Sequence, residues 1–187
     1  MGSWTFSSIL TRFRLRLLVP AALAVVCALA GARAQADTEP LPPGAVAPNF
    51  TADADGGGKM DLASHRGRVV VLDFWATWCP PCQASLPHLN NVAKAAAGQN
   101  VDFLGVCVSD QREKFDAWMT KNRPNYVVKF GYDPTRTETG AHYRVSGIPT
   151  TYIIDANGKV AEAIIGYSGS NDHRLETALR KVGINLP

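Results

Sequence analysis

The feature that most constrains the fold is a short apolar run followed at once by two closely spaced cysteines. Residues 69–74 read Val-Val-Val-Leu-Asp-Phe, a continuous run that favours a strand buried on both faces. Cys79 and Cys82 come next, where the chain enters a helix predicted over residues 80–97. Pro81 suits the first turn of that helix, because no backbone N–H is needed there. The pattern therefore predicts a strand-to-helix junction that carries the cysteine pair.

Further strands and helices alternate along the rest of the chain. We expect strands over 49–54, 59–62, 101–108, 126–132, 150–154 and 159–165, and helices over 111–122, 136–143 and 171–182. The turn Asp155-Ala156-Asn157-Gly158 predicts a hairpin between the last two strands. This order predicts an α/β fold, a central mixed β-sheet flanked by helices, with an N-terminal strand/hairpin extension.

The head of the chain has the pattern of an export signal. Arg12, Arg14 and Arg16 precede an apolar run over residues 17–30, which is too short to span a bilayer comfortably. Small residues follow, and we expect cleavage after Ala36. The predicted divisions are a signal peptide over 1–36, an extended proline-rich linker over 37–48 and one domain over 49–187. We therefore expect export by general secretion to the periplasm, with an uncleaved membrane anchor as the alternative.

The charge balance gives no indication of a nucleic-acid partner. The formal net charge is +3, but residues 1–36 hold four arginines and no acid. Residues 37–187 hold 15 Lys and Arg against 16 Asp and Glu, a net charge of −1. A nearly neutral domain lacks the basic surface that binding to nucleic acid requires.

The position of the two cysteines favours redox chemistry. The first turn of a helix leaves backbone N–H groups unpaired, so a thiolate at Cys79 would be stabilised and its pKa lowered. Cys82 lies one turn on, within disulfide reach, and a disulfide that closes so small a loop stabilises the fold little. A structural disulfide remains the alternative. A zinc site needs about four ligands, and the chain has no second Cys-x-x-Cys and no paired histidines, so we expect no metal.

Four separated segments carry a resemblance to a known family. They are Val46-Ala47-Pro48-Asn49-Phe50, the run from Val70 to Cys82, Val145-Ser146-Gly147-Ile148-Pro149-Thr150 and Ile153-Ile154-Asp155-Ala156-Asn157-Gly158. Together they resemble the thioredoxin superfamily and, within it, the exported TlpA/ResA-like thiol–disulfide oxidoreductases. The resemblance implies a thioredoxin-like fold and a cofactor-free enzyme that exchanges disulfides with protein substrates.

The resemblance also implies roles for single residues. Cys79 matches the nucleophile that attacks a partner's disulfide, and Cys82 matches the cysteine that resolves the mixed disulfide. Pro149 matches a cis-proline that faces the pair. The residues implied to contact substrate are Trp78, Pro80, Ile148 and Thr150, with the Ile148 backbone offering a strand edge.

Asp73 matches a carboxylate beneath the cysteines. Burial should raise its pKa, and it could then take the proton of Cys82 during resolution. Many TlpA/ResA-like members have a glutamate where this chain has Ser85 and an asparagine where it has Asp73. The carboxylate is therefore interpreted as relocated. The cytochrome-maturation subgroup shows Pro-Glu where this chain has Pro149-Thr150, which argues against a dedicated role on apocytochrome c.

The dipeptide Pro80-Pro81 between the cysteines carries no charge and no donor. We therefore expect a reducing pair, nearer about −270 than −120 mV. A reductant in an oxidising compartment needs a membrane protein that supplies electrons, and its clients would be cysteine pairs awaiting haem or copper. We expect a monomer.

Two other functions remain open. A peroxiredoxin-like thiol peroxidase is suggested by Ala47-Pro48-x-Phe50, although Thr77 stands two residues before Cys79 rather than three. A module that holds Cu(I) between Cys79 and Cys82 is the third candidate. Outside the motif, Cys107 is interpreted as buried and unreactive and Trp118 as core. The four histidines, His65, His88, His142 and His173, are interpreted as surface residues.

Overall fold

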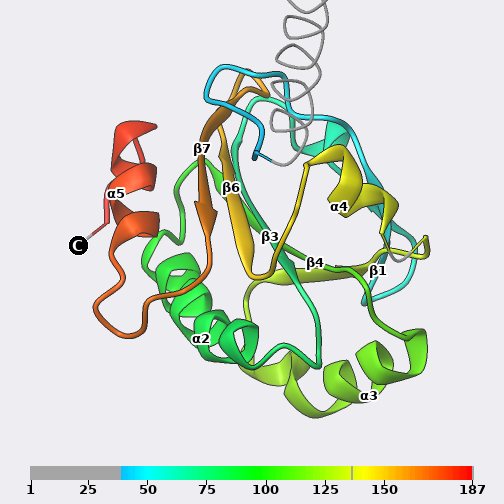
Figure 1. Ribbon diagram of the computed structural model, residues 1–187. Coiled ribbons are helices and arrows are strands. Elements are labelled where there is room, and N and C mark those ends of the chain that lie inside the picture. The colour runs from blue at the N-terminus through cyan, green and yellow to red at the C-terminus, as the bar shows by residue number, and fades with distance from the viewer. Residues whose placement is uncertain (1–38, 136, 187) are drawn as a thin grey trace, which may run out of the picture. The chain divides into compact units, whose positions relative to one another are not determined.

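The computed structural model describes residues 39–135 and 137–186, so the predicted signal peptide over 1–36 lies outside the described part (Figure 1). The strands are β1 (Thr51–Ala54), β2 (Lys59–Asp61), β3 (Val69–Trp75), β4 (Val101–Cys107), β5 (Lys129–Tyr132), β6 (Thr150–Ile154) and β7 (Val160–Ile165). Within the described residues they form one seven-stranded sheet in the order β2-β1-β5-β4-β3-β6-β7. β3, β4 and β5 are parallel, and the other neighbours pair antiparallel. The expected mixed sheet and its N-terminal hairpin are confirmed.

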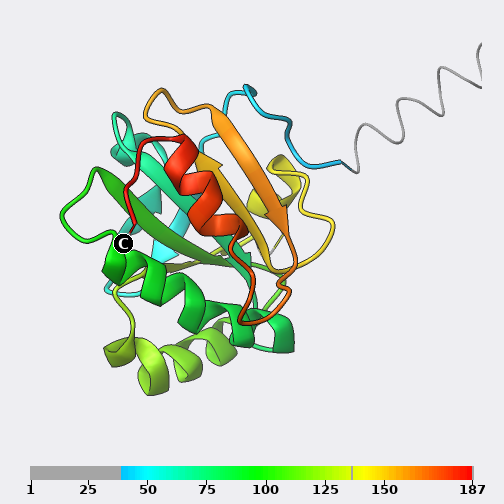
Figure 2. The same cartoon turned by 90° about the vertical axis from the view of Figure 1, so that its left-hand side faces the viewer.

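The helices lie on both faces of this sheet. They are α2 (Pro80–Ala95), α3 (Arg112–Asn122), α4 (Glu138–His142) and α5 (Arg174–Lys181). Figure 1 shows α4 on the side of the sheet opposite to α2 and α5, and Figure 2 shows α5 in front of the sheet above α2. Among the described helices, none has the length and apolarity needed to cross a bilayer.

Two hydrophobic clusters hold the layers together. Alternate residues of β3 point to opposite faces, because side chains along a strand alternate. Val71 and Trp75 join the cluster under α2, α3 and α5, whereas Leu72 and Phe74 join the cluster on the α4 side. Every residue of β3 is buried, as the continuous apolar run predicts.

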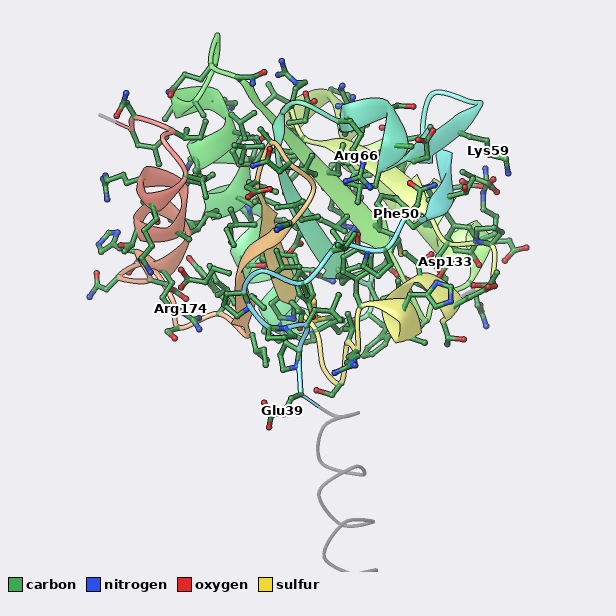
Figure 3. All side chains as sticks on the ribbon, turned by 90° about the horizontal axis from the view of Figure 1, so that it is seen from above. Glu39, Phe50, Lys59, Arg66, Asp133 and Arg174 are labelled. Carbon is green, nitrogen blue, oxygen red and sulfur yellow. A yellow bond between two sulfur atoms is a disulfide. The ribbon has the colours of Figure 1, made fainter. Side chains whose placement is uncertain are left out.

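Of the segment predicted as a linker over 37–48, residues 39–48 are described and belong to the folded unit, which begins at Glu39. The Gly44 N–H donates to the Val160 carbonyl at 2.8 Å, and the Ala47 N–H donates to the Gly158 carbonyl at 3.0 Å. Ala47 is buried, and Figure 3 shows the chain from Glu39 to Phe50 running over the domain. The predicted domain start at residue 49 is therefore too late. The prolines make this segment extended, but pairing with β7 holds it in place.

The predicted element boundaries agree with the structure within a few residues. The largest shifts are three residues each, at α5, which begins at Arg174 rather than residue 171, and at β5, which begins at Lys129 rather than residue 126. Residues Arg123–Asn125 form a short 3-10 helix that follows α3 directly. The strand β5 therefore begins later than the apolar pattern predicts. Apolar residues before a strand look like part of it in sequence, and only the packing tells them apart.

Candidate active site

The cysteine pair lies at the junction between the end of β3 and the start of α2. Cys79 is the N-cap residue of α2, and its Sγ accepts a hydrogen bond from the Cys82 N–H at 3.2 Å. The two cysteines are joined by a disulfide. Cys79 is 3% exposed and Cys82 is fully buried, so the first sulfur is the one nearer solvent. An N-cap sulfur faces unpaired backbone N–H groups, which stabilise a thiolate once the disulfide is reduced.

The loop before β6 meets the cysteines from the other side. The Ile148–Pro149 peptide bond is cis, as the resemblance implies. The Ile148 carbonyl oxygen lies 3.7 Å from Cys79 Sγ. Thr150 is buried, and its Oγ1 donates to the Gly147 carbonyl at 2.7 Å, which ties the loop to the first residue of β6. β6 pairs with β3, so the strand that leads into the cysteines also positions the proline loop.

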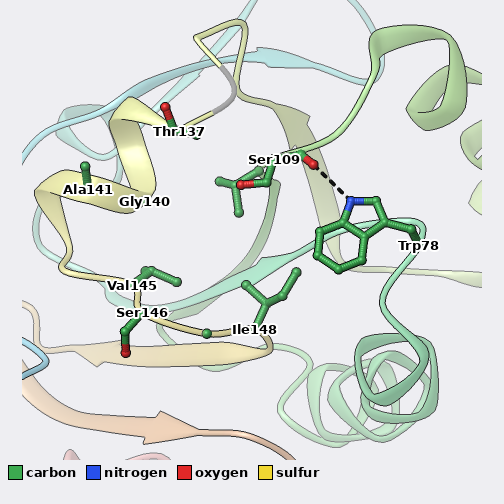
Figure 4. Close-up of a pocket in the computed structure, with 10 residues that line it drawn as sticks. Trp78, Ser109, Thr137, Gly140, Ala141, Val145, Ser146 and Ile148 are labelled. Atoms are coloured by element: carbon green, nitrogen blue, oxygen red, sulfur yellow. Dashed lines mark hydrogen bonds between the residues drawn. The ribbon is translucent and has the colours of Figure 1, made fainter. Parts of the chain in front are cut away.

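Trp78 forms the rim of the site. Its side chain is 58% exposed, and its Nε1 donates to the Ser109 carbonyl at 2.9 Å (Figure 4). Pro80 is also exposed. Trp78 and Ile148 border a mostly apolar pocket of about 320 Å³, which continues to Val145 and to Gly140 of α4. The pocket opens beside the cysteine pair and is large enough for a side chain of a substrate.

A buried carboxylate that the sequence analysis missed holds this rim. Asp110 accepts from the Thr77 N–H at 2.7 Å and from the Gln111 N–H at 2.8 Å. It therefore ties the loop after β4 to the loop that carries the cysteines. An aspartate directly before a helix is a common N-terminal signal, but its contact with a segment 33 residues away is not visible in sequence.

Asp73 lies in the middle of β3 and is 2% exposed. Thr151 Oγ1 donates to its Oδ1 at 2.7 Å, whereas its Oδ2 has no hydrogen-bond partner among the described residues. Burial raises the pKa of Asp73 to about 7, against the smaller opposing effect of the Thr151 hydrogen bond. The expected raised pKa is confirmed.

Cys107 ends β4 and is fully buried, as expected. Burial raises the pKa of its thiol well above the ordinary range, and the neighbouring Asp110 carboxylate raises it further. Trp118 packs against the core, with its ring centroid 4.6 Å from that of Trp75.

Two of the four histidines interpreted as surface residues are only partly exposed. His65 is 13% exposed at its side chain, and its Nδ1 lies 2.7 Å from Asp102 Oδ2. His88 is 22% exposed, and its Nε2 lies 3.4 Å from Glu176 Oε1. Both acidic partners are distant in sequence, so the pattern around each histidine gave no sign of its burial. The described residues contain no cluster of three or more His, Cys, Asp or Glu arranged to hold a metal ion.

Comparisons with known proteins agree with this site. The AhpC/TSA family model matches residues 43–163. The thiol-disulfide oxidoreductase ResA of Bacillus subtilis is 31% identical over 131 residues, covering 70% of this chain and 72% of the relative.

Solved structures show the same likeness. A Chlorobium tepidum protein provisionally named thiol:disulfide interchange protein DsbE has a TM-score of 0.66 and 30% identity, covering 76% of this chain and 98% of that one. A secreted Mycobacterium tuberculosis disulfide oxidoreductase homologous to E. coli DsbE has a TM-score of 0.59 and 26% identity, covering 71% and 95%. A strand-to-helix cysteine pair, a facing proline loop and these similarities lead to one conclusion: the chain belongs to the AhpC/TSA family and is a thiol–disulfide oxidoreductase of the ResA/DsbE type.

Proposed function

We propose that the protein is a periplasmic reductase of disulfides in exported proteins. The observation that carries the proposal is the asymmetry of the cysteine pair. Cys79 lies at the helix N-cap beside an apolar pocket, and Cys82 is buried behind it. In the reduced enzyme the Cys79 thiolate attacks a client disulfide and one client thiolate leaves. Cys82 then attacks Cys79 Sγ, the second client thiolate leaves, and the enzyme holds the disulfide.

Asp73 acts in this scheme as the proton acceptor for Cys82. A buried thiol is a poor nucleophile until it loses its proton. A carboxyl group that titrates close to pH 7 can both accept that proton and release it again near neutral pH. Ser85 cannot replace it, since its Oγ donates to the Cys82 carbonyl at 3.0 Å and a hydroxyl group is not a base at this pH.

The client polypeptide binds along the proline loop. Among the described residues, no backbone hydrogen bond takes up the Ile148 N–H, so an extended client segment can pair there as an added strand. The apolar pocket bordered by Trp78 and Ile148 then receives a side chain next to the client cysteine. Exposed Pro80 completes the proposed contact region. Thr150, expected to contact substrate, is buried with its hydroxyl bonded to the Gly147 carbonyl, so its proposed role is to hold the shape of the loop.

The direction of electron flow follows from the dipeptide Pro80-Pro81. Neither proline has a charge or a side-chain donor, so the thiolate lacks the extra stabilisation that makes a pair strongly oxidising. A reductase in the periplasm requires a membrane thiol–disulfide donor. The arginine-rich head with its short apolar run supports export, and a secreted relative of solved structure agrees with it. The clients we favour are cysteine pairs awaiting haem or copper, and the monomer is the proposed working form.

The test is the reduction potential of the Cys79–Cys82 pair, measured by equilibration with dithiothreitol or glutathione buffers. We expect a value below about −230 mV. A value above about −180 mV would contradict the reductase and indicate a disulfide donor or isomerase. A Cys82→Ser variant should accumulate mixed disulfides with clients in the periplasm, and a Cys79→Ser variant, as the matched control, should accumulate none.

A further inference from the structure

A small cavity lies between β3, α2, the proline loop before β6 and the start of α5. Asp73 of β3 and Ser85 and His88 of α2 line it, and Tyr167 lies at its other side. Its volume is about 30 Å³, which is room for one or two water molecules. Neither cysteine lines this cavity, but Pro149 does. The cavity shares no lining residue with the pocket bordered by Trp78 and Ile148.

Three buried polar atoms in this region make no hydrogen bond among the described residues, namely Asp73 Oδ2, His88 Nε2 and Glu176 Oε2. His88 Nε2 lies 3.4 Å from Glu176 Oε1, so Asp73 Oδ2 is the atom on the cavity wall that is left without a protein partner. Buried polar groups are almost always paired with protein or with water, so this oxygen points to bound water. The cavity has the volume for that water, and Asp73 and His88 both line it.

His88 connects this cavity to the surface. Its side chain is 22% exposed, its Nε2 lies 3.4 Å from Glu176 Oε1, and its ring packs at 5.9 Å from the Tyr167 ring. Glu176 also lies 3.6 Å from His173 Nδ1, whose side chain is 71% exposed. Imidazole is the side chain that most readily gains and loses a proton near neutral pH.

The other charged groups on this side are already paired. Asp172 lines the cavity, but its carboxylate binds the Arg174 guanidinium at 2.6 Å and accepts from the Ser168 N–H at 2.9 Å. The Arg174 interactions hold the pKa of Asp172 well below its usual range. Asp172 therefore stays charged and does not compete for the proton of Asp73.

We propose that His88 carries protons between Asp73 and solvent through the water of this cavity, with Glu176 holding the imidazole in place. The inference rests on the proposed role of Asp73 as proton acceptor for Cys82. The proton that leaves the Cys82 thiol moves to Asp73, then through cavity water to the His88 ring, and from the ring to bulk water. The carboxylate of Asp73 is restored, and no proton has to pass the client that covers the cysteines.

The experiment follows the resolution step directly. The reduced protein without its predicted signal peptide, in which Cys79 and Cys82 are the reactive pair and Cys107 is buried, is mixed with one equivalent of dithiobis(nitrobenzoate). The first thionitrobenzoate reports attack by Cys79, and the second reports resolution by Cys82. The variants compared are Asp73→Asn, His88→Ala and His88→Gln, with the exposed His142→Ala as the control.

We expect the second phase to slow about 100-fold in Asp73→Asn and about 10-fold or more in His88→Ala and His88→Gln, while the first phase is unchanged. Added imidazole should restore the rate of His88→Ala in proportion to its concentration and should not restore Asp73→Asn. His142→Ala should match the unsubstituted protein. This pattern requires a proton carrier at His88.

Other results overturn the inference in distinguishable ways. If Asp73→Asn is slow but His88→Ala keeps the full rate, the route is refuted and the role of Asp73 stands. If His88→Gln restores the rate, or imidazole fails to rescue His88→Ala, His88 serves only as a structural contact. If Asp73→Asn resolves at the full rate, the proton-acceptor role fails and the route fails with it.

Discussion

Replacing Asp73 with Asn should stabilise the oxidised protein at pH 8 and leave its stability almost unchanged near pH 4. Burial raises the pKa of Asp73 from 3.8 to about 7 in the native protein, and the unfolded chain keeps the ordinary value. Between these two pH values the native state binds a proton that the unfolded state has released. Stability contributed by this group is therefore fully present below about pH 4 and is lost as the pH rises to about 7.

The size of the effect follows from the shift. A displacement of about three pH units, at about 1.4 kcal/mol per unit, corresponds to about 4 kcal/mol lost on ionising Asp73 in place. Asn keeps the shape of the side chain and can still accept from Thr151 Oγ1, but it never ionises. The free energy of unfolding of Asp73→Asn minus that of the unsubstituted protein should rise by up to about 4 kcal/mol between pH 4 and pH 8.

Denaturant unfolding of both oxidised proteins at several pH values measures this difference. Other carboxylates, Asp172 among them, change stability with pH in both proteins and cancel in the subtraction. The exposed Glu113→Gln removes one carboxylate without burial and should show a nearly constant difference. A difference for Asp73→Asn that is equally flat from pH 4 to pH 8 would refute the assignment of a buried, ionisable Asp73.

Three shorter predictions follow from the packing. Gly105→Ala should lower the free energy of unfolding by about 1–3 kcal/mol, because the new Cβ would lie 2.8 Å from the buried Phe130 ring; denaturant unfolding checks this. Asp110→Asn should lower the free energy of unfolding by about 1–3 kcal/mol in the same measurement. Asn has one acceptor oxygen in place of two, so either the Thr77 N–H or the Gln111 N–H loses its acceptor. Cys107 should stay unmodified by iodoacetamide in the reduced native protein and react only after denaturation, as peptide mass spectrometry would show.

Local patterns in the sequence were sufficient to predict most of the sheet. β3 is a continuous apolar run because helices cover both of its faces, and its burial follows from that run alone. β5 is harder, because the apolar residues at 126–128 precede the strand instead of extending it. Tyr126 and Val128 pack against the core, whereas Val127 is 56% exposed. The folded segment over 41–47 was missed for a related reason. Its prolines indicate an extended chain but say nothing about the β7 backbone that binds it.

The candidate site contains residues that could be predicted from the sequence and residues that could not. The cysteines were predicted from their spacing at a strand-to-helix junction, and Asp73 and Pro149 from the resemblance to the thioredoxin superfamily. Asp110 and His88 contact partners 33 and 88 residues away, respectively: the Thr77 N–H and Glu176. Such contacts depend on where the loop after β4 and helix α5 lie in the folded protein, and no local pattern in a single sequence indicates this.

The buried carboxyl group of Asp73 lowers the stability of the fold, and this loss of stability bears on its role. An apolar residue in the middle of β3 would remove a buried carboxyl group whose Oδ2 has no protein partner, together with an ionisation penalty of about 4 kcal/mol above pH 7. A purely structural position would favour that replacement, since proteins gain stability readily by such changes. Asp73 and Ser85 face the same cavity from β3 and α2, so a carboxyl group on either element would reach the same water. A strand backbone holds the carboxyl group of Asp73 more rigidly. Its Oδ2 has no protein partner, so it can exchange a proton with water. The penalty in stability therefore supports the proposed role of Asp73 as a proton acceptor that titrates near neutral pH.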